Sequence, residues 1–167
     1  MNTTTDTIEK TILLRAPLHR VWRAISDSAE FGTWFGVTFE GPFVAGAPVR
    51  GTITSTKVDP EVARQQKPHE GKAFHIVVDQ IEPERLFSFR WHPYEIEPGM
   101  DYSTEPTTLV AFRLRETSEG VQLTLTESGF DQIPLERRAR AFAANEGGWS
   151  LQMILISKYL ENAAPPQ

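Results

Sequence analysis

The sequence of 167 residues contains no cysteine, which excludes disulfide bridges, thiolate zinc sites and cysteine nucleophiles. It has no apolar run of membrane-spanning length, and its first residues, MNTTTDTIEK, lack the apolar stretch of a signal peptide. Basic residues are fewer than acidic ones: the chain has 17 Lys and Arg and 22 Asp and Glu, which gives a formal net charge of −5. This balance argues against nucleic acid as the main partner, since phosphate contacts need a basic surface. We therefore expect a cytoplasmic protein without a membrane span.

Sequence motifs of common enzymatic chemistry are missing as well. The chain has no G-x-S-x-G segment, no phosphate-binding glycine loop and no dinucleotide fingerprint. Its four histidines, His19, His69, His75 and His92, do not have the spacing of metal ligands. The sequence therefore predicts neither a metal nor a cofactor.

What the chain does contain is typical of one globular domain, and we assign residues 1–167 to a single unit. Hydrophobic residues make up 40% and charged residues 23% of the sequence, close to the average for such proteins. A domain of this length buries about two-thirds of its unfolded surface, so it can hold a core without covalent cross-links.

The pattern of apolar residues predicts an α+β protein with an antiparallel sheet of about six or seven strands. Strands are expected at 7–17, 47–57, 72–81, 85–92, 107–117 and 120–128. Helices are expected at 17–27, as a short helix or turn around FGTWFG, and over about 134–162. Residues 58–69 read as a polar excursion and 93–106 as a long irregular loop.

Six segments of the chain together resemble the bacterial SRPBCC superfamily. They are RAPLHRVWRAISD, FGTWFG, GPFVAGAPVRG, RLFSFRWHP, LTLTESGF and NEGGW, and they fall in family order from about residue 8 to residue 162. The nearest branch is similar to the C-terminal domain of the activators of Hsp90 ATPase. The resemblance implies a helix-grip fold, in which a curved sheet wraps around a long C-terminal helix, with two short helices after the first strand and an apolar cavity between sheet and helix. It does not fix a function, because the superfamily includes carriers, cyclases, hydrolases and chaperone activators.

The last predicted helix carries two adjacent glycines, Gly147 and Gly148, each of which costs a helix interior about 1 kcal/mol relative to alanine. They lie beside a stripe at helical spacing that we expect to face the sheet. The stripe comprises Phe142, Glu146, Trp149, Met153, Ile156 and Leu160. The glycines either leave room for a ligand cavity or allow tight packing against the FGTWFG turn.

Alternation along two strands predicts which side chains face the helix. Val121, Leu123, Leu125 and Glu127 share the apolar face of one strand, and Phe87, Phe89 and Trp91 share a face of another. Both faces of 72–81 contain apolar residues, so the direction of His75 stays open. We expect a ligand-binding set drawn from these faces, the helix and the loop: Trp34, Phe89, Trp91, Tyr102, Glu127, Glu146 and Trp149.

Glu127 and Glu146 are the candidate catalytic residues, because two carboxylates in one apolar space can serve as acid and base. They are also interpretable as polar anchors for a ligand. As structural groups, Glu127 would pair with an arginine or lie at the solvent rim, and Glu146 would cap backbone groups in the FGTWFG turn. The loop at 93–106 is either a lid at the mouth of a cavity or a surface excursion.

Three functions follow as hypotheses. The first is a protein that binds a hydrophobic or aromatic small molecule in an internal apolar cavity. The second is an enzyme of the polyketide cyclase or hydrolase type that uses Glu127 or Glu146 as acid–base. The third is an interaction module similar to the Hsp90 activators. The sequence leaves open the ligand and the oligomeric state, monomer or homodimer.

Overall fold

The structure is a computed structural model that describes residues 7–92 and 106–162. Its elements in chain order are β1 (Thr7–Leu14), α1 (Leu18–Ser26), α2 (Ser28–Phe35), β2 (Val37–Phe39), β3 (Pro48–Ile53), α3 (Pro60–Gln66), β4 (Ala73–Glu82), β5 (Leu86–Trp91), β6 (Thr108–Thr117), β7 (Gly120–Ser128) and α4 (Leu135–Asn162). Two short 3-10 turns, at Lys67–His69 and Phe130–Gln132, precede β4 and α4.

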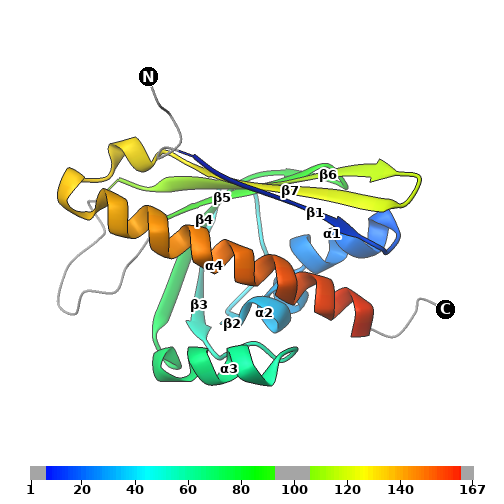
Figure 1. Cartoon of the computed structure of the whole chain (residues 1–167), viewed down its shortest axis with the longest axis horizontal. Helices are drawn as coiled ribbons and strands as arrows, with labels where there is room; N and C mark the ends of the chain where they lie inside the picture. Colours follow the sequence, from blue (N-terminus) through cyan, green and yellow to red (C-terminus); the bar gives the residue numbers. More distant parts are fainter. Residues whose placement is uncertain (1–6, 93–105, 163–167) are drawn as a thin grey trace.

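The strands form one seven-stranded antiparallel sheet in the order β1-β7-β6-β5-β4-β3-β2. Figure 1 shows α4 lying along one face of this sheet, while β3 and β4 turn away from the direction of β6 and β7. The sheet therefore bends around the helix, and the predicted helix-grip architecture is confirmed.

Strict alternation explains how the sheet buries one face. In β7 the side chains of Val121, Leu123, Leu125 and Glu127 are all buried, as their period of two predicts. The same period settles β4, where Ile76 and Val78 are buried and His75 is exposed on the outer face.

Two glycines of the FGTWFG segment shape the turn from α2 into β2. A Cβ atom at Gly32 would lie 1.9 Å from the carbonyl oxygen of Val37, so only glycine lets α2 approach β2 this closely. Gly36 ends the helix in the left-handed conformation, at φ 103°, which glycine adopts without strain. The aromatic residues of α2 are thereby held against the sheet.

Two elements lie outside the prediction from sequence. The strand expected at 47–57 ends at Ile53, and the polar excursion contains the helix α3. Asp59 caps this helix by accepting from the backbone N–H groups of Glu61 and Val62, and Pro60 occupies its first turn. The short strand β2 pairs with β3 at one edge of the sheet.

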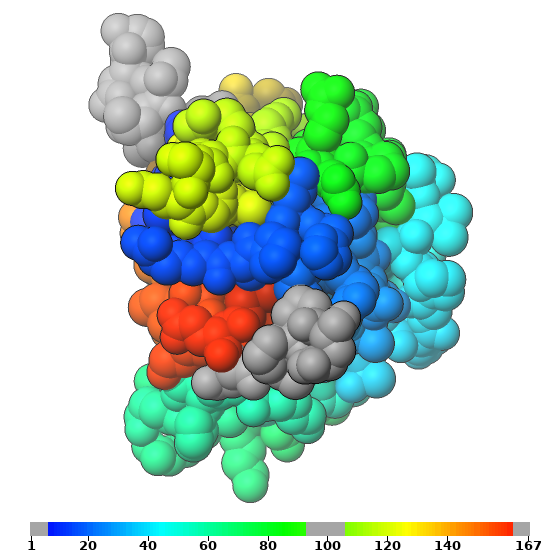
Figure 2. Space-filling model, turned by 90° about the vertical axis from the view of Figure 1, so that its right-hand side faces the viewer, coloured from blue at the N-terminus to red at the C-terminus, as the bar shows by residue number. Residues whose placement is uncertain are grey.

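The C-terminal part of α4 is fixed by polar contacts to the α1–α2 and α3 segments. Lys158 Nζ donates to Asp59 Oδ2 at 2.5 Å, and Tyr159 Oη donates to Glu30 Oε1 at 2.8 Å. Figure 2 shows this end of α4, in red, between the N-terminal elements in blue and α3 in green. Buried Met153, Leu155 and Ile156 hold the same part of the helix to the core.

Aromatic side chains fill much of the space between sheet and helices. Phe31 has ring contacts with seven other aromatic residues, with centroids 4.7–6.5 Å apart. They lie in α2, β2, the loop after β2, β5 and β6: Trp34, Phe35, Phe39, Phe43, Phe87, Phe89 and Phe112. Tilted and edge-to-face arrangements of this kind are the favourable ones. The centre of the molecule is therefore a packed aromatic core.

Candidate functional site

A buried carboxylate lies where β5, β6, β7 and α4 meet. Glu127 is 0% exposed and accepts hydrogen bonds from four side chains on three other elements. Trp149 Nε1 donates to Oε1 at 2.8 Å, and Trp91 Nε1 donates to Oε2 at 2.8 Å. Thr108 Oγ1 donates to Oε2 at 2.5 Å, and Asn145 Nδ2 lies 3.0 Å from both oxygens. We call Glu127 and these four donors the Glu127 cluster.

The donor set of this cluster is complementary to a carboxylate. All four partners are neutral side chains, and indole and amide N–H groups only donate. A buried charge is tolerated when hydrogen bonds replace its hydration, and bonds to a charged acceptor are stronger than neutral ones. Each oxygen has at least two donors, so the carboxylate is occupied by its structural partners. The cluster thereby fixes the two indole rings relative to each other.

A pocket of about 100 Å³ lies directly beside this cluster. Its lining residues come from α2, β5 and α4: Phe35, Trp91, Ala144, Asn145, Gly148, Trp149 and Gln152. Ala144 and Gly148 are exposed, so the pocket opens at the surface of α4. Three of its lining residues, Trp91, Asn145 and Trp149, are the same side chains that Glu127 holds.

Aromatic rings form the walls of this pocket. The ring centroids of Trp91 and Trp149 are 5.7 Å apart, and Phe35 lies 6.3 Å from Trp91 and 6.0 Å from Trp149. An engineered apolar cavity of about 150 Å³ binds benzene, so a pocket of this size suits one small ring. The walls offer that ring mainly apolar and aromatic contact.

Gln152 contributes a polar amide group to the residues that line the pocket. Its Nε2 donates to the carbonyl oxygen of Phe35 at 3.4 Å, a long hydrogen bond. Its Oε1 is buried and has no hydrogen-bond partner among the described residues. The carbonyl of Phe35 also accepts from Gln66 Nε2 of α3 at 3.3 Å, so two amides hold the end of α2.

Glu146 does not face the interior, contrary to the expectation from its spacing. Its side chain is 50% exposed and forms an ion pair with Lys10 Nζ at 2.7 Å, across a surface groove of about 410 Å³ between β1 and α4. Asn145 takes the inward position instead, and the next residue is turned about 100° around the helix axis. The two glutamates therefore do not share one apolar space.

The adjacent glycines lie on the exposed side of α4 at the level of the pocket. A Cβ atom at Gly147 or Gly148 would meet nothing within 4 Å among the described residues, so tight packing against the FGTWFG turn is not their role. Gly148 lines the pocket, and Gly147 does not belong to the residues around it. The absent side chain at Gly148 leaves the pocket open to the surface.

The remaining residues of the expected ligand-binding set lie elsewhere. Trp34 is fully buried, donates to the carbonyl oxygen of Ala24 at 2.9 Å and contacts Phe31 rather than the pocket. Phe89 is also fully buried and packs behind Trp91, with ring centroids 5.3 Å apart. Tyr102 and the loop at 93–105 lie outside the described residues.

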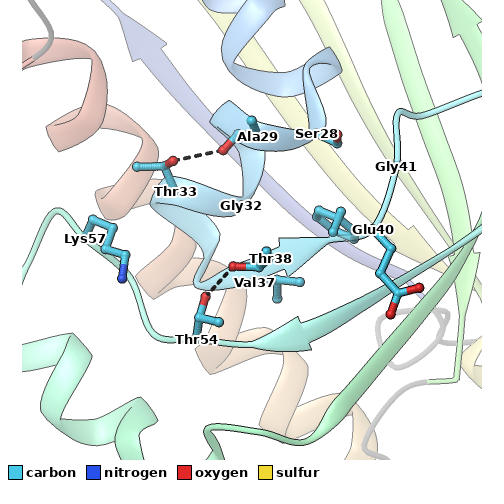
Figure 3. Close-up of a pocket in the computed structure, with 11 residues that line it drawn as sticks. Ser28, Ala29, Gly32, Thr33, Val37, Thr38, Glu40, Gly41, Thr54 and Lys57 are labelled. Carbon is cyan, nitrogen blue, oxygen red and sulfur yellow. Dashed lines mark hydrogen bonds between the residues drawn. The ribbon is translucent and has the colours of Figure 1, made fainter.

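A second, larger pocket of about 330 Å³ lies between α2, β2 and the segment after β3. Figure 3 shows Lys57 and Glu40 at its opposite ends and two hydrogen bonds donated by threonine hydroxyl groups. Thr33 Oγ1 donates to the carbonyl oxygen of Ala29, and Thr38 Oγ1 donates to Thr54 Oγ1. The threonine hydroxyls of this pocket are thus engaged in hydrogen bonds, and its walls carry, among the described residues, no indole rings held by a buried carboxylate. We regard the aromatic pocket as the better candidate site.

Over residues 7–92 and 106–162, no group of three or more His, Asp or Glu side chains is placed to hold a metal ion. None of the helices in the same ranges is long and apolar enough to cross a membrane.

Reasoning from the sequence missed Phe35, Thr108, Asn145 and Gln152. Phe35 belongs to the FGTWFG segment that the sequence singled out, but its direction depends on how Gly36 ends α2. Asn145 and Gln152 are seven residues apart, two turns of one helix, and that polar spacing on the inward side was a usable signal.

Comparisons with known proteins agree with the fold. The model of the family described as "Activator of Hsp90 ATPase homolog 1-like protein" matches residues 15–161. A search of curated proteins found no match.

Solved structures resemble the whole chain at low sequence identity. An Arthrobacter aurescens protein matches with a TM-score of 0.71 at 16% identity, covering 99% of this chain and 91% of its own. Mesorhizobium loti protein MLL2253 matches with a TM-score of 0.68 at 18% identity, and the match covers 95% of this chain and 98% of MLL2253. DynU16, a protein of the dynemicin biosynthetic locus, matches with a TM-score of 0.66 at 24% identity. The match covers 96% of this chain, which spans about half (49%) of DynU16. Likenesses at these identities show the shared fold.

Proposed function

We propose that this chain, which belongs to the Activator of Hsp90 ATPase homolog 1-like family, binds a small molecule through an aromatic or apolar group. That group enters the pocket beside the Glu127 cluster. The proposal rests on the pocket rather than on the family's name, because one fold hosts many functions.

One observation carries the proposal: two indole rings line an open pocket, and a single buried carboxylate holds both of them. Side chains locked by hydrogen bonds before binding lose little freedom when a ligand arrives, and this preorganisation favours affinity. A core that served stability alone has no need to leave about 100 Å³ open beside two tryptophans.

Glu127 supports the pocket from behind. Its two oxygens already accept from Trp91, Thr108, Asn145 and Trp149, and it is 0% exposed. A general acid or base must reach the proton that it transfers, directly or through one water. The geometry therefore favours a binding protein over an enzyme that uses Glu127 as acid–base, and it favours a positioning role over direct contact with ligand.

Adjacent glycines provide a matched test. Gly148→Leu places a side chain at the pocket, whereas Gly147→Leu adds the same atoms one position away on the same exposed stretch of helix. Toluene is the probe, because it is one ring in size and does not absorb at 295 nm, where tryptophan is excited. We expect a saturable change in tryptophan emission, with a dissociation constant of about 1 mM for so small a buried area.

Binding to the native chain and to Gly147→Leu, with at least a ten-fold loss in Gly148→Leu, supports the proposal. No saturable response in the native chain, or an equal response in both variants, rejects it. Circular dichroism of both variants checks that the helix is retained.

A further inference from the structure

We infer that the bound ring carries a hydrogen-bond donor, such as a phenolic hydroxyl or an aromatic N–H group, and that Gln152 Oε1 accepts from it. The inference rests on the proposed function and names the chemical class of its ligand. Its starting point is Gln152, which lines the pocket and whose buried Oε1 atom has no partner among the described residues.

The orientation of the Gln152 amide follows from its other contact. The carbonyl oxygen of Phe35 only accepts, so the group that faces it at 3.4 Å must be Nε2. Turning the amide over would set two oxygens against each other without giving Oε1 a donor. The hydrogen bond to Phe35 is long, so a small rotation of the terminal amide towards a ligand costs little.

The hydrogen-bonding groups of the pocket wall point to the same class of ligand. The indole N–H groups of Trp91 and Trp149 and the amide nitrogen of Asn145 are all donors, and all of them are engaged by Glu127. The amide nitrogen of Gln152 is engaged by Phe35. Gln152 Oε1, which accepts, is the buried side-chain atom of the wall that has no partner among the described residues, while the Gln152 NH₂ group keeps one N–H beyond its bond to Phe35. An incoming donor therefore meets an acceptor without a partner, whereas a carboxylate on the ring would bring its charge to a pocket whose described lining residues include no cation.

Phenol and fluorobenzene form the matched pair of probes, because they are similar in size and only phenol donates. We expect phenol to bind the native chain about five- to ten-fold more tightly than fluorobenzene, and benzoate to bind more weakly than either. Chemical shifts of the indole N–H groups, followed by NMR during titration, give the dissociation constants.

Gln152→Met removes the acceptor and keeps the approximate length of the side chain. Gln66→Met is its control, since Gln66 also donates to the carbonyl of Phe35 but does not line the pocket. The inference predicts that Gln152→Met binds phenol and fluorobenzene equally, while Gln66→Met retains the preference for phenol. If Gln152→Met does not fold, anisole replaces the variant: methylation of the oxygen removes the donor, and the native chain should then lose the preference.

The possible failures are distinguishable. If all neutral rings bind the native chain equally, or if the phenol preference survives Gln152→Met, the inference is wrong and the binding function stands. If Gln66→Met loses the preference as fully as Gln152→Met does, the effect acts through the position of Phe35 and the assigned acceptor is wrong. If no probe binds the native chain, the proposed function itself fails.

Discussion

Two carboxylates are held against α4, and they are stabilised in opposite ways. Glu127 accepts from the α4 residues Asn145 and Trp149 and has only neutral partners. Glu30 of α2 lies near the other end of α4, where it accepts from Arg20 at 2.7 Å, from Arg23 at 2.8 Å and from Tyr159 at 2.8 Å. The first site borders the pocket, and the second joins three helices.

The surroundings of Glu30 favour its charged form. Burial alone would raise the pKa of Glu30, but hydrogen bonds from Tyr159, Arg20 and Arg23 outweigh burial and lower the pKa below its ordinary value. Burial raises the pKa of Tyr159, and the bond to Glu30 adds to this effect. Arg20 also lies over the Tyr159 ring, 5.3 Å from its centroid.

We propose that the difference between the two sites separates a structural role from a functional one. At the Glu30 site, cations neutralise the carboxylate, and the hydrogen bonds link α1, α2 and α4. This site therefore stabilises the packing of the three helices. At the Glu127 site, neutral donors leave a wall of indole rings without a competing cation beside the pocket. We therefore regard the Glu30 site as a structural contact between helices and the Glu127 cluster as the support of a binding surface.

Removing the carboxylate of Glu127 should have the largest effect on stability. Glu127→Leu leaves two indole N–H groups, an amide and a hydroxyl buried without their acceptor, so we expect a loss of about 3–5 kcal/mol in the free energy of unfolding. Urea unfolding followed by circular dichroism measures it.

Glu127→Gln sharpens this result, because glutamine keeps the shape but has one accepting oxygen. Its NH₂ group must then face a donor, either Trp91 or Trp149, so we expect an intermediate loss of about 1–3 kcal/mol. A loss below about 1 kcal/mol in both variants would show that the cluster is not a structural support.

Glu30→Gln should cost less, about 1–2 kcal/mol. The side chain is 21% exposed, and water can replace part of what Arg20, Arg23 and Tyr159 supply. The same urea measurement applies. A loss as large as that of Glu127→Leu would remove the distinction between the two sites.

The pH dependence of stability isolates the contribution of Glu30. Since its pKa is lower in the folded state than the ordinary 4.5, its stabilisation is fully present above that value and is lost as pH falls through the folded pKa. The native chain should therefore lose stability more steeply than Glu30→Gln from about pH 5 to pH 3. Parallel curves for the two proteins would contradict the assignment.

A third carboxylate, Glu146, lies on α4 itself, and its removal should have the smallest effect on stability. It is half-exposed in its pair with Lys10, and exposed pairs contribute about 0–1 kcal/mol. Glu146→Gln should change the unfolding free energy by less than about 1 kcal/mol and leave toluene binding unchanged. A large effect on binding would return Glu146 to the candidate site.

Local periodicity predicted the fold and one half of the site. Alternation along β7 placed Glu127 inward, and alternation along β5 placed Trp91 on the same face, because the apolar row of each strand is the row that faces the core. The long helix was predicted to begin at about residue 134, and it begins at Leu135. The Asp59-Pro60 start of α3 was readable in the sequence, whereas the three-residue strand β2 is too short to produce a pattern.

The other half of the site depends on the rotation of α4 about its axis. Glu146 and Asn145 are neighbours in sequence, and a stripe that begins at either one includes Trp149 within one turn. Only the packing of the helix on the sheet decides that Asn145 reaches Glu127 while Glu146 pairs with Lys10. Phe35 and Gln152 meet across 117 positions of sequence, a contact that no local pattern contains.

The most direct test of the central claim, that Glu127 holds Trp91 and Trp149 as two walls of a ligand pocket, is an NMR titration of the native chain with toluene. The chain has four tryptophans, so Trp22 and Trp34 serve as internal controls for the indole N–H signals. We predict that the signals of Trp91 and Trp149 shift together and saturate with one dissociation constant, while those of Trp22 and Trp34 stay in place. Unmoved signals for Trp91 and Trp149, or equal shifts of all four indoles, would contradict the account.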